Sequence, residues 1–136
     1  MRMKKYKGYL IDLDGTMYKG TERILEAVHF VQELKRQEIP YLFVTNNSSR
    51  TPEQVAEKLR QFDIPATGEQ VFTTSMATAN YIYEKKQDAS VFIIGEDGII
   101  EACKEKGFTF KNEDADFVIT GIDRGITYEK LSVACL

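Results

Sequence analysis

Short apolar runs alternate with amphipathic helical segments along the chain, and this alternation restricts the fold more than any other sequence feature. Val28, Val31 and Leu34, for example, recur at three-residue spacing and so share one face of a predicted helix. Strands that alternate with helices predict parallel βαβ units in an open sheet with helices on both faces. Extended segments are predicted at residues 7–12, 41–44, 71–72, 91–94, 108–110 and 115–120, and helices are predicted to start near residues 24, 51, 75 and 98.

The composition excludes several classes of protein. Of the 136 residues 43% are hydrophobic and 29% charged, which is typical of a globular chain. The net charge of -3 provides no basic field for nucleic acid or an anionic membrane. No apolar run reaches the roughly 18–20 residues of a membrane span, and Cys103 and Cys135 form no metal-type pair. We therefore expect a cytoplasmic protein with neither nucleic acid nor membrane as a partner.

Two aspartates, Asp12 and Asp14, directly follow the first predicted strand. The rise of a strand places their Cα atoms roughly 6–7 Å apart, on one side if the extension continues. Carboxylates this close repel unless a cation or a shared proton relieves them, and open α/β sheets bind ligands at this edge. One carboxylate could then act as nucleophile and the other as general acid. An ordinary acidic turn at Gly15 is the alternative, with about even weight from the spacing alone.

The second predicted strand also ends in polar residues, beginning with Thr45 and Asn46. A hydroxyl and the backbone N–H groups of the following turn can hold an anion such as a phosphoryl group. The alternative is a loop that caps the next helix, since Thr51 and Pro52 are typical of a helix start. The two interpretations, anion binding and helix capping, are compatible. An acidic pair at the end of one strand together with Thr-Asn at the end of the next is less expected by chance than either motif alone.

These motifs resemble the haloacid dehalogenase-like superfamily. Residues 12–16 (DLDGT) match its first motif, and Thr45 with Asn46 matches its second. The longer strings LIDLDGTMYKG and FVTNNSSRT, together with residues 121–124 and 127–131, are similar to the NagD-like branch, which includes sugar-phosphate and nitrophenyl-phosphate phosphatases. The resemblance covers almost the whole chain and implies a Rossmann-like α/β core with a parallel sheet.

The resemblance also implies a function. The protein would be a phosphoric monoester hydrolase that uses Mg²⁺ and acts on a small phosphorylated metabolite, such as an acid sugar phosphate. Asp12 would attack the phosphoryl group to form an aspartyl-phosphate, and Asp14 would protonate the leaving oxygen and then activate water. The Asp12 carboxylate and the Asp14 carbonyl would bind Mg²⁺, and Thr45 with the Asn46 amide would hold the phosphoryl group. A phosphomutase of the same superfamily and a non-catalytic phospho-acceptor or binding domain are the alternatives.

The domain organisation follows from the motifs that are missing. By the resemblance, the family's third motif, a lysine, and its fourth, a Gly-Asp segment, follow a long insertion, and no Gly-Asp-x-x-x-Asp match occurs after Asn46. Leu131, Val133, Ala134 and Leu136 run apolar to the last residue, with no glycine or basic turn after them. We expect the N-terminal portion of a longer protein, in which residues 1–84 are the first part of the catalytic core and residues 85–136 an incomplete α/β cap domain. These 136 residues need not be active alone, and a homo-oligomer is left open.

Four lesser candidates have structural explanations that we favour. His29 is expected to be a partly exposed helix residue, and Cys103 is expected to be buried packing. Residues 95–98 are expected to start a helix rather than to bind a metal. Arg124 could reach a substrate carboxylate from the cap, because arginine makes bidentate contacts, but an exposed turn residue is the favoured interpretation.

Overall fold

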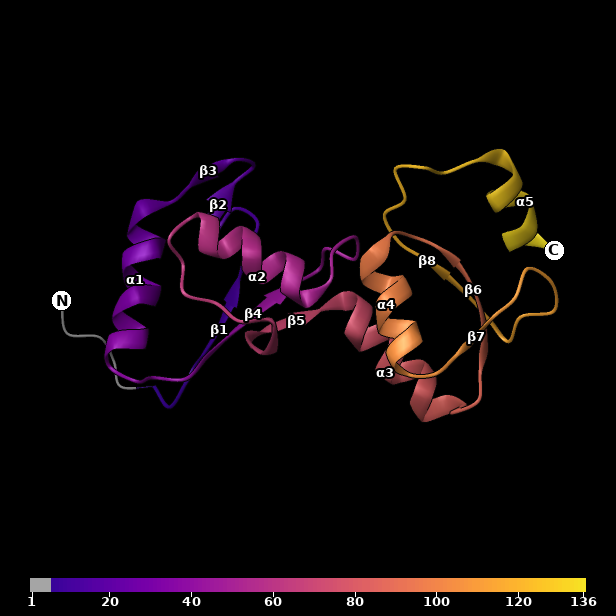
Figure 1. The fold of residues 1–136 in the computed structure, drawn as a ribbon, viewed down its shortest axis with the longest axis horizontal. Helices are drawn as coiled ribbons and strands as arrows, with labels where there is room; N and C mark the ends of the chain where they lie inside the picture. Colours follow the sequence, from indigo (N-terminus) through magenta and orange to yellow (C-terminus); the bar gives the residue numbers. More distant parts are fainter. Residues whose placement is uncertain (1–5) are drawn as a thin grey trace. The chain divides into compact units, whose positions relative to one another are not determined.

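A computed structural model describes residues 6–136 and divides the chain into two compact units. The first unit comprises the residues up to Thr45 together with Pro52–Phe72. The second unit comprises Asn46–Thr51 and Thr73–Leu136. Each unit has its own small sheet, and Figure 1 shows their elements in chain order.

The sheet of the first unit has the strand order β1-β4-β5, with bounds Tyr9–Asp12, Tyr41–Thr45 and Val71–Thr73. Strands β1 and β4 are parallel, in a register that runs from Tyr9 beside Tyr41 to Asp12 beside Val44. Because parallel strands end at the same edge, the carboxyl end of β1 lies next to that of β4. The predicted strand sequences therefore form one sheet edge.

Helices α1 (Leu25–Arg36) and α2 (Pro52–Gln61) supply the apolar side chains that cover this sheet. The core of the unit joins them to Ile11 and Phe43, which are 7% and 0% exposed. Within residues 6–136 these helices cover only one face of the sheet, since Leu10, which points the other way, is 78% exposed. Successive right-handed crossovers that advance in one direction across the sheet place both helices on the same face. The helical residues buried in this core are Val28, Val31, Leu34, Val55, Ala56 and Leu59.

A short antiparallel hairpin, which the sequence analysis missed, follows β1. It consists of β2 (Tyr18–Lys19) and β3 (Glu22–Arg23). Gly20 lies in the turn with φ of +59°, a conformation that glycine adopts without steric cost. Two residues per strand are too few to produce an alternating pattern, so only the glycine pointed to a turn.

The second unit is a three-stranded sheet of order β7-β6-β8, all parallel, with bounds Thr109–Phe110, Ser90–Ile94 and Phe117–Thr120. Helices α3 (Thr74–Lys85) and α4 (Asp97–Glu105) bury Ala79, Ile82, Ile99 and Cys103 against it. The last helix of this unit is α5 (Tyr128–Cys135), whereas a 3-10 turn, η1 (Gly68–Gln70), belongs to the first unit and precedes β5. The strands predicted at residues 91–94, 108–110 and 115–120 are confirmed, as is the fold class of parallel α/β units.

Candidate active site

The acidic motif lies where β1 ends. Asp12 is the last residue of the strand, and Leu13 beyond it is fully buried in the core. Asp12 and Asp14, on either side of Leu13, are both exposed. The alternation of buried and exposed side chains therefore continues past the end of the strand. Leu13 packs in the core, and both carboxylates lie at the surface.

The backbone turns sharply after Asp14. Gly15 has φ of +82°, which favours glycine at this position. The carbonyl of Leu13 accepts hydrogen bonds from the N–H groups of Thr16 (3.1 Å) and Met17 (2.8 Å). The Thr16 hydroxyl donates to Oδ2 of Asp12 at 3.3 Å. The chain therefore turns away from the direction of β1 at Asp14, while Leu13, Thr16 and Met17 are held by hydrogen bonds of the turn.

Neither aspartate takes part in the ion pairs found among residues 6–136. In this part of the chain, no three His, Cys, Asp or Glu side chains gather into a candidate metal cluster. The donor set at the end of β1 is therefore two carboxylates and nearby backbone carbonyls, all of them oxygen. Such a set suits Mg²⁺, which is usually bound through one or two carboxylates and retains several waters.

Thr45 ends the neighbouring strand. Since Asp12 lies beside Val44 in the register, Thr45 is one residue further along a strand about 4.8 Å away. Thr45 alternates with Val44 and is 4% exposed on the core side. The structure thus brings Asp12, Asp14 and Thr45 to one edge of the sheet, while their catalytic and binding roles stay predictions.

Asn46 is exposed and begins the segment that groups with the second unit. The loop after it is ordered by its own side chains, since Oδ1 of Asn47 accepts from the N–H (2.8 Å) and the hydroxyl (2.7 Å) of Ser49. The role of Asn46 rests on its place next to Thr45, and it too stays a prediction.

The rest of the second unit holds this loop closely. The carbonyl of Ser48 accepts from the Ser75 hydroxyl at 3.1 Å, and the Ser48 hydroxyl accepts from the Ile122 N–H at 3.2 Å. The Gly98 N–H donates to the Ser49 carbonyl at 3.1 Å. A Cβ at Gly98 would lie only 2.4 Å from the Ser48 carbonyl oxygen, so the backbone of the loop packs directly against the backbone of Gly98. Nothing in the sequence indicated these contacts, because they join residues far apart in the chain.

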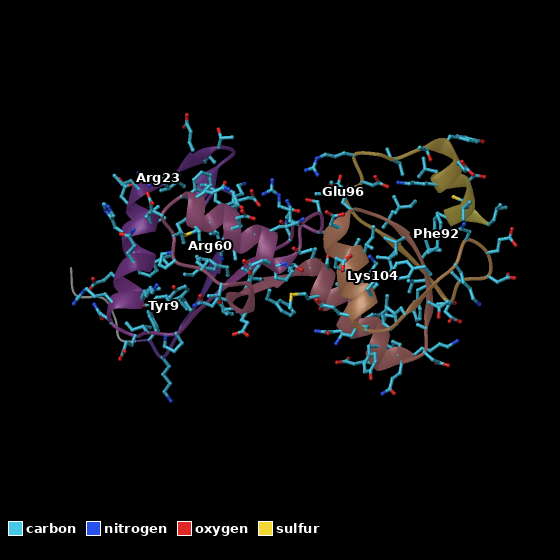
Figure 2. The ribbon with its side chains drawn as sticks, viewed as in Figure 1. Tyr9, Arg23, Arg60, Phe92, Glu96 and Lys104 are labelled. Atoms are coloured by element: carbon cyan, nitrogen blue, oxygen red, sulfur yellow. The ribbon has the colours of Figure 1, made fainter. Side chains whose placement is uncertain are left out.

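The lesser candidates have the structural roles that we favoured. His29 is exposed on α1, and the segment 95–98 leads into α4. Cys103 is buried, and burial raises the pKa of its thiol to about 11, so it is a packing residue rather than a nucleophile. Arg124 binds both carboxylate oxygens of Glu96, through its main-chain N–H (2.7 Å) and through Nη1 (2.6 Å). Figure 2 labels Glu96, next to the start of α4.

Open parallel α/β sheets bind their ligands at the carboxyl ends of the strands, and in this unit the paired carboxylates of Asp12 and Asp14 lie at that edge. Residues 9–109 match the haloacid dehalogenase-like hydrolase family. The chain belongs to this family, and the resemblance inferred from its two motifs is confirmed.

The chain is also similar to named proteins. It is 69% identical over 134 residues to the 5'-nucleotidase YutF of Bacillus subtilis (98% of this chain, 52% of the relative). It is 52% identical over 135 residues to the acid sugar phosphatase of Staphylococcus haemolyticus (98% and 51%). The crystal structure of a double mutant of the thermostable NPPase from Geobacillus stearothermophilus superposes with a TM-score of 0.91 at 64% identity (98% and 52%).

NagD from Escherichia coli K-12 has a TM-score of 0.85 at 23% identity, covering 96% of this chain and 52% of that one. At this identity the likeness shows a common fold and nothing more. The chain spans about half the length of the curated relatives it matches. None of the helices in residues 6–136 has the length and apolarity that crossing a bilayer requires.

Proposed function

We propose that the protein hydrolyses a small phosphomonoester, with Asp12 as the nucleophile. The observation that carries this proposal is the pair of exposed carboxylates after β1, without a basic partner among the described residues, beside the end of β4 at Thr45. The membership in the hydrolase family supports it. The relatives named above, a 5'-nucleotidase and an acid sugar phosphatase, support it as well, since both names describe cleavage of phosphomonoesters.

In the first step of the proposed reaction, a carboxylate oxygen of Asp12 attacks phosphorus as the bond to the ester oxygen breaks. Asp14 donates its proton to that oxygen, which leaves as an alcohol. In the second step, Asp14 removes a proton from a water that attacks the phosphorus. The Asp12–phosphorus bond breaks, phosphate leaves and the Asp12 carboxylate returns. The proton given by Asp14 in the first step is recovered in the second.

Thr45 and Asn46 are proposed to hold the transferring phosphoryl group. The Thr45 hydroxyl and the Asn46 N–H lie on consecutive residues at the end of β4, where donors can meet the oxygens of a phosphate placed above the strand ends. The contacts of Ser48 and Ser49 with other residues of the second unit support this role, because they restrict the loop that carries Asn46.

Phosphatases of this family generally use a divalent metal ion. We propose Mg²⁺, held by the Asp12 carboxylate and the Asp14 main-chain carbonyl, because the donors at this edge are all oxygen. When bound, the ion offsets the negative charge of the nucleophile and of the phosphoryl group. The residues of this chain then set the direction of attack and the position of the proton donor.

The proposed substrate is an acid sugar phosphate or a similar small metabolite. We also propose that residues 1–84 belong to the catalytic core and residues 85–136 to a cap that restricts access to it. Action in the cytoplasm stays a prediction from the sequence.

The test is the hydrolysis of 4-nitrophenyl phosphate and of a sugar phosphate by the full-length gene product that carries this chain, with and without Mg²⁺. Asp12→Asn is expected to remove activity, because an amide cannot act as the nucleophile. Asp114→Asn makes the same chemical change at an exposed residue with φ of +52°, a conformation that asparagine tolerates, and is expected to remain active. Retained activity of Asp12→Asn would end the proposal, and release of free phosphate rather than an isomeric sugar phosphate would exclude a phosphomutase.

A further inference from the structure

The hairpin β2–β3 is attached to the C-terminal end of α2 by a group of contacts that we call the hairpin clamp, defined as Tyr18, Arg23, Lys58, Phe62 and Asp63. We infer that the hairpin clamp positions Asp14 for proton transfer to the leaving group. This inference rests on the proposed function, and of the positioning residues it assigns only Tyr18 lies within the sequence strings that carried the resemblance.

The polar half of the clamp joins β3 to the end of α2. A guanidinium nitrogen of Arg23, labelled in Figure 2, pairs with Oδ2 of Asp63, and it also contacts the Phe62 carbonyl at 3.5 Å. Asp63 is itself fixed, because its N–H donates to the Arg60 carbonyl at 3.0 Å and its carbonyl accepts from Gln32 Nε2 of α1 at 2.9 Å. The pair therefore joins the hairpin to a residue whose main chain is fixed, although the two paired side chains are themselves 43% and 66% exposed.

The aromatic half of the clamp joins β2 to α2. The ammonium of Lys58 lies 3.8 Å from the centre of the Tyr18 ring, and the rings of Tyr18 and Phe62 are 5.4 Å apart. Tyr18 is only 4% exposed. A cation close to a ring face is attracted by its quadrupole, most strongly where water is excluded. Figure 1 shows the hairpin beside the end of α2 that provides these groups.

Tyr18 connects the hairpin clamp to the turn that contains Asp14 and Gly15. Asp14 and Tyr18 form an isolated β-bridge, and the Gly15 N–H donates to the Tyr18 carbonyl at 2.8 Å. The peptide that follows Asp14 is thus held through Tyr18. Asp12, in contrast, belongs to β1 and is held by its pairing with β4.

The two aspartates therefore depend on different supports. Asp14 is exposed and lies beyond the strand, so its position depends on the turn and on the hairpin. A general acid must come within about 3 Å of the oxygen that it protonates. Loss of the clamp is expected to impair proton donation by Asp14 while leaving attack by Asp12 largely intact.

The leaving group separates these two effects. Nitrophenolate is stable as an anion and needs little protonation, whereas the alkoxide of a sugar phosphate needs a proton donor. The quantity to measure is kcat/KM, which reports the steps up to release of the leaving group, for 4-nitrophenyl phosphate and for glycerol phosphate. The full-length gene product is used, with Arg23→Met, Lys58→Met and the double variant.

We expect the ratio of kcat/KM for glycerol phosphate to that for 4-nitrophenyl phosphate to fall about 10-fold in the double variant, a fraction of what a general acid contributes. Lys58→Arg should keep most of the wild-type ratio that Lys58→Met loses, because arginine also stacks on aromatic rings. Arg36→Met is the matched control, since Arg36 pairs with Glu33 on α1 in the same unit and does not contact the hairpin clamp.

A second measurement needs neither substrate nor metal. Hydrogen exchange of the Gly15 amide in metal-free protein should become several-fold faster in the double variant and stay unchanged in Arg36→Met. An unchanged kcat/KM ratio in an active, folded double variant would overturn the inference. Failure of the proposed function differs from this result, because it would appear as an inactive wild type or an active Asp12→Asn variant.

Discussion

The two units are both built from three-stranded sheets and helices. They differ in whether the acidic residues near the carboxyl ends of their strands form ion pairs. In the second unit, Glu96 after β6 pairs with Arg124, and Asp123 after β8 pairs with Lys130 at 2.7 Å. The hydrogen bond from Lys130 lowers the pKa of Asp123 below its ordinary value. In the first unit, Asp12 and Asp14 take part in none of the ion pairs found in residues 6–136.

This difference separates structural carboxylates from carboxylates available for chemistry. A paired carboxylate such as Asp123 has its charge satisfied by the fold, and it also accepts from the Gly125 N–H at 2.8 Å. Asp12 and Asp14 are exposed and have no such partner among the described residues, so their charges are left for a ligand or cation to neutralise. Acidic residues after a strand are therefore not alike, and only tertiary contacts distinguish them.

After the complete loss of activity expected from Asp12→Asn, the largest effect is expected from Asp14→Asn. Loss of the proton donor should lower kcat/KM for a sugar phosphate about 10²- to 10⁴-fold, while the thermal midpoint should stay the same or rise because a like charge is removed beside Asp12. Activity assays and thermal unfolding of the full-length gene product measure both. Asp123→Asn is the control in the second unit, and it should lower the thermal midpoint more than the activity. The reverse pattern in these two variants would contradict the comparison.

Gly98→Ala tests how the second unit holds the loop that carries Asn46. The added Cβ would lie 2.4 Å from the Ser48 carbonyl oxygen and 2.5 Å from that of Arg50. Such a clash should destabilise the protein by about 1–3 kcal/mol, and the KM for a phosphomonoester should rise. At Gly125, by contrast, the nearest atom, Oδ1 of Asp123, would be 3.4 Å from the added Cβ, so Gly125→Ala is the matched control. Urea unfolding measures the difference, and equal effects in the two variants would refute the tight packing of the loop.

A smaller effect is expected from pH. The hydrogen bond from Lys86, with those from the Ser90 N–H and hydroxyl, lowers the pKa of Asp116 from 3.8 to about 2. Because the folded pKa is depressed, Asp116 stabilises the fold fully above about pH 4, and this contribution is lost as the pH falls towards 2. Urea midpoints between pH 5 and pH 2.5 should therefore fall more steeply in the wild type than in Asp116→Asn. Asp114→Asn, an exposed change two residues earlier in the chain, should retain the wild-type slope.

The smallest effect is expected from the pair of Glu96 with Arg124. The Arg124 side chain is 68% exposed, and exposed pairs contribute about 0–1 kcal/mol. Arg124→Met should leave the free energy of unfolding within about 1 kcal/mol of the wild type and should leave KM unchanged. A tenfold rise in KM confined to substrates with a carboxylate would instead assign Arg124 to substrate binding, which the sequence left as the less favoured alternative.

Local sequence was sufficient for most of the elements. The helix from Pro52 and the strand Tyr41–Thr45 lie where the apolar spacing and the Thr51-Pro52 signal predicted them. The hairpin at Tyr18–Arg23 was missed, since its strands are too short to show a pattern and its contacts with Lys58 and Asp63 join residues far apart in the chain. The placement of both helices of the first unit on one face was also missed, because it depends on the order of strands in the sheet.

The sequence by itself determined the family and the candidate site residues, because Asp12, Asp14, Thr45 and Asn46 lie within short motifs that can be read locally. Only the tertiary structure decided which carboxylates have basic partners and how the turn after β1 is held. Those properties depend on contacts between residues as far apart as Arg23 and Asp63, or Ser48 and Ile122. Local spacing carries no information about such contacts, since they form only when separate elements pack together.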